Sequence, residues 1–210
     1  SPDGTWVVTT ESGVALQADA VILATPAFAS SALVAGQSPE LSRELSQIPY
    51  VTSATATLAY ARSEFPAAPD GFGVVIPKPE HRRIKAFTWV TTKFFGRAPA
   101  DTVLVRCFVR PDDDSGAPLD DTALASAAQD EIADILGVRS SPLWTRVFRW
   151  ERAMPQYVVG HIERVERIFR LVEELPGLGL AGGAYRGSGI PDTVSHSRAE
   201  ARRIVEGLAD

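Results

Sequence analysis

The feature that most constrains the fold is a short apolar run followed by a glycine-rich turn and a helical pattern. Residues 178–181 are apolar, glycines stand at 182, 183, 187 and 189, and a helix-like pattern covers residues 193–208. Glycine lets the backbone turn tightly and approach a ligand closely, and a helix start offers unpaired N–H groups. The order predicts a strand, a turn and a helix beside an electron-rich group. A tight connection that binds nothing is the alternative interpretation.

A second unbroken apolar run, residues 20–24, lies near the other end of the chain. Such a run predicts a strand buried on both faces of a sheet that helices cover. We expect it to share one sheet with residues 178–181. A β-hairpin is predicted from residues 5–10 and 14–17, and helices are predicted at 28–35, 39–47 and 161–175.

The middle of the chain differs from the two ends in its pattern of residue types. Alternating, β-branched segments predict an antiparallel sheet, with strands at 52–60, 73–76, 84–91, 102–109 and 143–149. Residues 120–136 have apolar residues at helical spacing, and Gly137 marks the end of that helix.

Composition excludes several classes of protein. The chain has 210 residues, a net charge of −5 and no basic stripe, which argues against a nucleic-acid partner. The single cysteine, Cys107, allows no internal disulfide or cysteine metal cluster, and its apolar run predicts a buried core residue. The three histidines lack the spacing of metal ligands, and His81 and His196 are expected to face solvent. A reducing, cytoplasmic setting fits a single thiol.

The chain opens within the predicted hairpin and has no initiator methionine, so we expect a piece of a longer protein. The pairs Gly177/Gly179 and Gly187/Gly189 lack the third glycine of a GxGxxG turn, and we reject both as dinucleotide-binding fingerprints.

Residues 181–192 (AGGAYRGSGIPD) closely resemble the C-terminal flavin-contacting motif of bacterial protoporphyrinogen/coproporphyrinogen oxidases, in the flavin amine oxidase superfamily. Further stretches fit that family in its order: 71–77 (GFGVVIP), 86–93 (AFTWVTTK), 97–99 (RAP), 104–109 (LVRCFV) and 149–161 (RWERAMPQYVVGH). The resemblance covers nearly the whole chain.

The resemblance implies a fold of α/β and α+β class. Residues 1–48 and 149–210 are expected to be C-terminal pieces of a Rossmann-like FAD-binding domain. They would flank a substrate-binding domain, residues 49–148, built of an antiparallel sheet and a helix. Because the GxGxxG unit is missing, the chain alone is expected to be inactive.

The resemblance also implies a flavin-based oxidation of coproporphyrinogen III or protoporphyrinogen IX in haem synthesis. Hydride passes to FAD, O₂ reoxidises the flavin to give H₂O₂, and six electrons leave the porphyrinogen. The partners would be porphyrinogen and O₂, in the cytoplasm; attachment to a membrane surface is left open.

Carried over residue by residue, the flavin contacts fall on Ser188, Gly189 and Ile190, with Pro191 beside them, and on Trp150. For Trp150 the alternative is a core aromatic next to a strand. In the middle lobe, Trp89 could supply an apolar slot for the macrocycle and Arg106 a cation for its propionates; ordinary sheet packing is the alternative for both. Catalytic residues are not assigned. His161 is a candidate acid–base residue, but the favoured interpretation is a structural hydrogen-bonding residue at a helix start.

Two other classes of function stay open. The parent protein could be another superfamily oxidase, such as an amine oxidase or a carotenoid desaturase, or the chain could be a non-catalytic binding module. A further expectation concerns the two terminal apolar strands, which would lack sheet neighbours in this chain. Exposed apolar surface there predicts self-association, including a homodimer.

Overall fold

The computed structural model describes residues 5–65 and 71–209, and its internal contacts form two compact units. Unit 1 consists of residues 1–51 and 154–210, and unit 2 of residues 52–153. The expected boundaries fell after residues 48 and 148. Residues 149–153, which include Trp150, therefore group by their contacts with unit 2.

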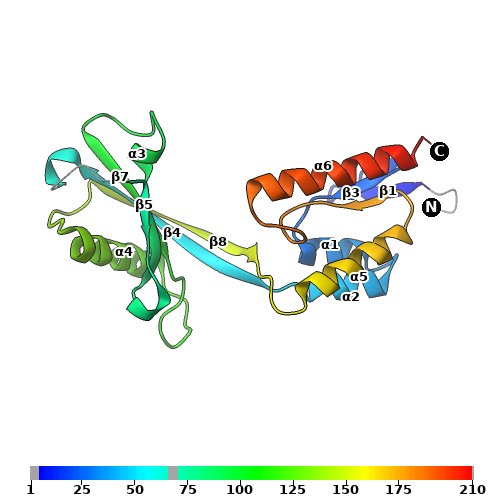
Figure 1. The fold of residues 1–210 in the computed structure, drawn as a ribbon, viewed down its shortest axis with the longest axis horizontal. Coiled ribbons are helices and arrows are strands. Elements are labelled where there is room, and N and C mark those ends of the chain that lie inside the picture. The colour runs from blue at the N-terminus through cyan, green and yellow to red at the C-terminus, as the bar shows by residue number, and fades with distance from the viewer. Residues whose placement is uncertain (1–4, 66–70, 210) are drawn as a thin grey trace. The chain divides into compact units, whose positions relative to one another are not determined.

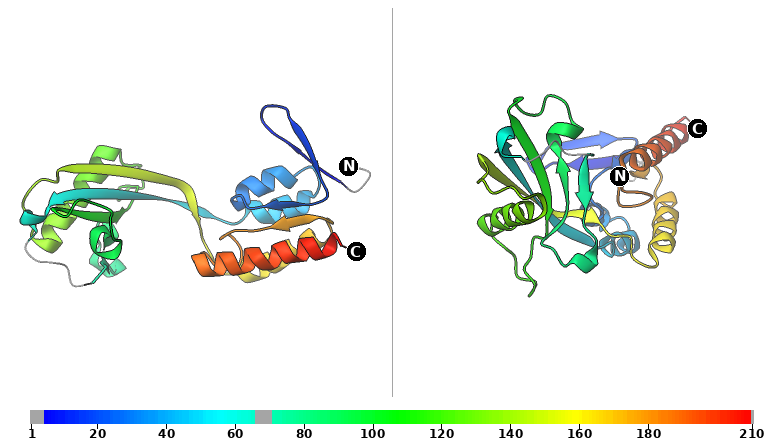
Figure 2. Two further views of the ribbon diagram at one scale, coloured as in Figure 1. Left: turned by 90° about the horizontal axis from the view of Figure 1, so that it is seen from above. Right: turned by 60° about the vertical axis from the view of Figure 1, so that its left-hand side comes forward.

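Two small sheets occur in the described part of unit 1. Strands β1 (Trp6–Thr9) and β2 (Ala15–Ala18) form the predicted antiparallel hairpin, which projects from the other elements of the unit (Figure 2). Strand β3 (Val21–Leu23) pairs in parallel with β9 (Leu178–Leu180), so that Val21 lies opposite Leu178. The prediction that the two terminal apolar runs share one sheet is confirmed.

Four helices enclose the β3–β9 pair. Helix α6 (Ile190–Gly207) lies on one side of it, and α1 (Ala27–Val34), α2 (Pro39–Ser46) and α5 (His161–Glu173) lie on the other (Figure 1). The second side holds the core of the unit, built from apolar side chains of these three helices and of β9, including Leu41, Leu45, Ile168, Leu178 and Leu180.

Two expectations for unit 1 need correction. Strand β3 is not buried on both faces, because its sheet has only two strands among the described residues and the side chain of Ile22 remains 39% exposed. Helix α6 begins at Ile190, not at residue 193. Pro191 fits its first turn, where the missing N–H of proline would have no partner within the helix.

The described residues of unit 2 include a five-stranded antiparallel sheet in the order β5-β6-β7-β4-β8. The long strands β4 (Tyr50–Ala61) and β7 (Thr102–Val109) pair at its centre, with Ala56 opposite Cys107. Strand β6 (Ile84–Trp89) joins β7 to the short β5 (Gly73–Val75), and β8 (Trp144–Pro155) is the other edge. Two single turns of 3₁₀ helix, Arg62–Glu64 and Lys78–Glu80, lie in the connections.

Helix α4 (Asp121–Leu136) covers one face of this sheet and forms the core with it. Asp120 caps its start through the amide of Ala123, and Gly137 ends it in the left-handed conformation, as predicted. Cys107 is fully buried there, as the sequence predicted. Over the described ranges, no helix has both the length and the apolar character to cross a bilayer.

The predicted bounds of two strands in unit 2 were wrong. Strand β6 ends at Trp89, and residues 90–91 belong to a short helix, α3 (Val90–Lys93). There Val90 packs with Ala59 and Leu104 on the sheet face opposite α4, which favours a helical turn over further pairing. Strand β8 continues past residue 149 to Pro155, because its neighbour β4 is equally long.

Candidate functional site

The connection between β9 and α6 is a turn whose shape requires glycine. Gly182 and Gly187 have φ values of +120° and +135°, a region that other residues rarely adopt. A Cβ atom added to Gly187 would lie 2.5 Å from the Cβ atom of Asp192. The glycine-rich loop, residues 182–189, therefore has a backbone shape that substitution at Gly187 would disturb.

The loop ends at an open helix start. Gly189 is the residue that precedes α6, and no side chain caps the first turn. Ser188, Gly189, Ile190 and Pro191 are all exposed. An uncapped, exposed first turn presents N–H groups and the positive end of the helix dipole. This arrangement fits the electron-rich edge of a flavin ring. The carboxylate of Asp192 lies in the same turn, within 3.1 Å of where a Cβ atom of Gly189 would stand.

One tyrosine bridges the two limbs of the glycine-rich loop. The hydroxyl of Tyr157 donates to the carbonyl oxygen of Gly183 at 2.7 Å and accepts from the amide of Gly187 at 2.9 Å. The hydroxyl of Thr193 in α6 also donates to the carbonyl of Gly187 at 3.0 Å. Backbone groups on both limbs are thus held by side chains from outside the loop.

His161 contacts the same loop and the ring of Tyr157. It is the first residue of α5, after Gly160 in the left-handed conformation, and it is 5% exposed. Its ring stacks on Tyr157 with centroids 4.0 Å apart. Its Nε2 atom lies 3.0 Å from the carbonyl oxygen of Tyr185. Because a carbonyl only accepts, Nε2 carries the proton. His161 thus lies at a helix start and makes a hydrogen bond there, as the structural interpretation predicts.

The interior behind the loop is apolar. Tyr185 is buried, and burial raises the pKa of its phenol, so the side chain stays neutral. His196 was expected to face solvent, and this prediction was wrong. Its ring is half-buried and makes a T-shaped contact with the ring of Phe169, with centroids 5.3 Å apart, because α6 packs closely on the unit. Burial, with a contribution from Arg186, lowers the pKa of the His196 imidazole.

Helix α6 is fixed to the strand that precedes the loop. Glu200, 5% exposed, accepts from the amide of Leu180 at 3.2 Å, and Arg203 donates to the carbonyl of Leu178 at 2.6 Å. The two side chains also form an ion pair at 2.8 Å. Gly179 permits the close approach, since a Cβ atom there would lie 3.2 Å from Ile204. The strand and the helix on either side of the glycine-rich loop are therefore tied together.

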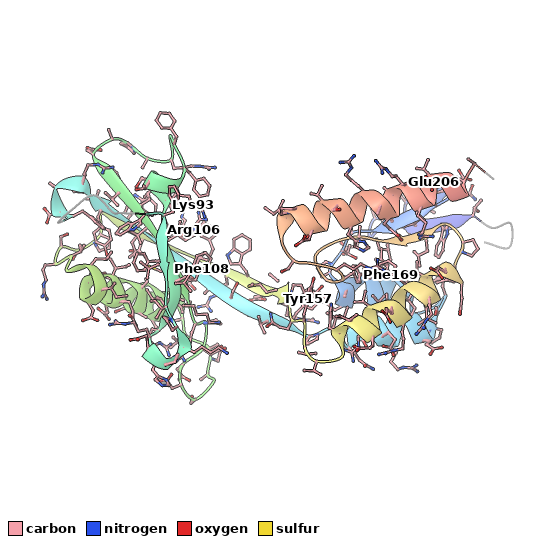
Figure 3. The ribbon with its side chains drawn as sticks, in the orientation of Figure 1. Lys93, Arg106, Phe108, Tyr157, Phe169 and Glu206 are labelled. Carbon is pink, nitrogen blue, oxygen red and sulfur yellow. The ribbon has the colours of Figure 1, made fainter. Side chains whose placement is uncertain are left out.

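Unit 2 carries a second candidate region, the sheet face opposite α4, which we call the open face. Successive side chains of a strand point to opposite sides, so Thr55 and Thr57 of β4 and Arg106 and Phe108 of β7 point away from the core. Arg106 and Phe108 project on the side opposite α4 (Figure 3), and α3, which carries Lys93, contacts β7.

Aromatic side chains and a cation characterise the open face. Phe108, Phe148 and Trp150 are between 41% and 51% exposed. Trp150 lies on β8 and its Nε1 atom donates to the hydroxyl of Thr55 at 3.5 Å. Arg106 is exposed, and no hydrogen-bond or ion-pair partner is found for it among the described residues. The combination suits a flat apolar ligand with acidic substituents.

The predicted site residues lie in different parts of the structure. Residues 188–191 come together at the start of α6, and Trp150 and Arg106 share the open face. Trp89 is 6% exposed and makes edge-on contacts with Phe65 and Phe87. This burial favours core packing, the alternative that the sequence had left open. The sequence analysis did not foresee the bridging role of Tyr157, although it matched residues 149–161 to the family.

Comparisons with known proteins agree on a family. The chain matches the family described as flavin containing amine oxidoreductase over residues 1–205. It is 37% identical over 198 residues to a coproporphyrinogen III oxidase of Propionibacterium freudenreichii, covering 92% of this chain and 37% of that protein. It is 30% identical to a human protoporphyrinogen oxidase over 211 residues, covering 97% and 43%.

A solved structure from Exiguobacterium sp. 255-15, named "Putative protoporphyrinogen oxidase", has a TM-score of 0.74 at 28% identity, covering 99% of this chain and 45% of that one. The chain thus spans less than half the length of the relatives it matches. The match across 205 residues, together with the mixed α/β unit and the antiparallel sheet, places the chain in the flavin-containing amine oxidoreductase family.

Proposed function

We propose that the full-length protein is an FAD-dependent, oxygen-using porphyrinogen oxidase of haem synthesis. The observation that carries this proposal is the exposed, uncapped start of α6 behind the glycine-rich loop, in a chain of a flavin-containing family. The names of the relatives supply the substrate class, since they are called coproporphyrinogen III or protoporphyrinogen oxidases. The proposed product is the porphyrin, with H₂O₂ released from O₂.

Ser188, Gly189, Ile190 and Pro191 would hold the flavin ring in this proposal, with Trp150 as a further contact. When bound, FAD supplies the acceptor for hydride from the porphyrinogen. The chain's own part is to place backbone N–H groups and a positive dipole end where the ring gains electron density. Unit 1 would then be the flavin-binding part and unit 2 the substrate-binding part.

The open face of unit 2 is the proposed substrate surface. A porphyrinogen is a broad apolar macrocycle with propionate side chains. The half-exposed rings of Phe108 and Phe148 can contact the macrocycle, and Arg106 can pair with a propionate. Trp89 would support this surface from the core and not touch the substrate. We propose a cytoplasmic location, in keeping with a lone, buried thiol.

The decisive experiment uses the full-length protein. We expect a visible flavin spectrum on purification, and porphyrin fluorescence that grows under air with coproporphyrinogen III or protoporphyrinogen IX. The faster substrate would identify the natural one. Bound flavin without porphyrin formation would indicate another oxidase of the family, and absence of flavin would overturn the proposal at its first step.

The same assay tests the open face. Arg106→Gln is expected to raise KM about tenfold and to change kcat little, because an ion pair to a propionate acts equally on substrate and transition state. Arg202→Gln, a change at an exposed position on α6, is the matched control. An unchanged KM in the Arg106 variant would remove this residue from the proposed site.

A further inference from the structure

Residues 155–161 make contacts that the proposed flavin and substrate surfaces do not explain. The backbone of this segment is anchored by the amide of Gln156, which donates to the carbonyl of Pro49 at 2.8 Å. From this anchor, Tyr157 and His161 reach three backbone groups of one loop: the carbonyls of Gly183 and Tyr185 and the amide of Gly187.

We infer that Tyr157 is a positioning residue for the flavin, acting through the glycine-rich loop. This inference rests on the proposed function. Tyr157 itself is bound to Gly183 and Gly187, and the proposed flavin contacts begin at the next residue, Ser188. Its hydroxyl fixes the distance between the two limbs of the loop, and thereby the place at which α6 starts.

The glycines of the loop leave its backbone conformational freedom that contacts from outside the loop can limit. Gly182 and Gly187 adopt backbone conformations with little strain, because glycine lacks a Cβ atom. For the same reason, the loop can adopt many other conformations. The Tyr157 hydroxyl, which donates to one limb and accepts from the other, restricts that freedom together with the hydroxyl of Thr193. The stacked ring of His161 in turn limits where the Tyr157 ring can lie, since His161 is buried and its Nε2 atom is engaged by Tyr185.

The test is Tyr157→Phe in the full-length protein, because this change removes the hydroxyl and keeps the stacked ring. Loss of the two hydrogen bonds is expected to raise the flavin dissociation constant about tenfold. The flavin midpoint potential and visible spectrum should change with it, and amide exchange at Gly187 should accelerate. His161→Gln, which removes the ring beneath Tyr157, is expected to shift flavin affinity in the same direction.

Tyr50→Phe is the matched control. The Tyr50 hydroxyl also accepts from a backbone amide of unit 1 at 2.9 Å, but this amide, that of Ala27, is at the start of α1 and not in the loop. A purely structural role for Tyr157 would give both variants the same small loss of thermal stability and unchanged flavin binding, and would overturn the inference. A parent protein without flavin would instead overturn the proposed function.

Discussion

At the scale of single residues, the glycine-rich loop depends on backbone conformations that only a few positions provide. Gly187 combines a φ of +135° with a neighbour, Asp192, that leaves no space for a Cβ atom. Gly207, at the end of α6, has neither restriction. The two glycines therefore predict opposite responses to the same substitution.

Gly187→Ala is expected to lower the free energy of unfolding by about 2 kcal/mol, from backbone strain and the displaced Asp192 side chain. Gly207→Ala should leave it unchanged or raise it by about 0.5 kcal/mol, because alanine is the better helix former. Urea unfolding of the two variants measures both effects. Equal stability of the two would show that the loop tolerates a side chain at Gly187.

At the scale of elements, the pairing of β9 with α6 depends on a buried carboxylate. Burial acts to raise the pKa of Glu200, but the hydrogen bonds from Arg203 and from the Leu180 amide outweigh it, and the pKa lies below the ordinary value of 4.5. A carboxylate whose pKa is lowered by folding stabilises the folded state at pH values above the pKa that the group has in the unfolded state. That stability is lost as pH falls through the folded-state pKa.

We therefore expect the free energy of unfolding to decrease as pH falls below about 4.5. Glu200→Gln should destabilise the protein at pH 7 and reduce this pH dependence. Glu206→Gln, on the exposed side of the same helix (Figure 3), is the control and should leave the pH dependence intact. Denaturant unfolding at several pH values measures the slopes. A Glu200 variant with the parent's slope would assign the dependence to other carboxyl groups.

Most helices and strands could be predicted from the sequence. Their signals are the spacing of apolar residues and the positions of glycine and proline, which depend only on neighbouring residues. The hairpin, the β3–β9 pair and α4 follow from such signals. The predicted bounds were wrong where tertiary packing determines where an element ends. Helix α3 forms because Val90 packs on the sheet, and β8 extends along β4. The role of Tyr157 could not be foreseen, since it joins backbone groups that lie 26 and 30 residues away.

At the scale of the whole molecule, unit 1 leaves apolar side chains in contact with solvent. Val7 is 46% exposed, Leu16 55% and Ile22 39%, all on the short strands β1, β2 and β3. An isolated chain with such a surface can bury it by associating with itself.

Sedimentation velocity of this chain alone is therefore expected to show a sedimentation coefficient that increases with protein concentration. Leu16→Lys should weaken the association, because it places a charge within the apolar surface. Thr9→Lys on the same hairpin controls for added charge. A single monomer boundary at all concentrations in the unmodified chain would contradict the expectation.

The parallel pairing of β3 with β9 has a consequence for the order of folding. The partners are separated along the chain by the whole of unit 2, which is continuous in sequence. During synthesis, unit 2 can complete its own strand pairing before β9 emerges from the ribosome. Strand β3 can pair with β9 only after β9 has been synthesised, because the two strands are joined by the whole of unit 2. The segment that carries the glycine-rich loop is translated after unit 2, and it thus completes the β3–β9 pair and the candidate flavin site in one step.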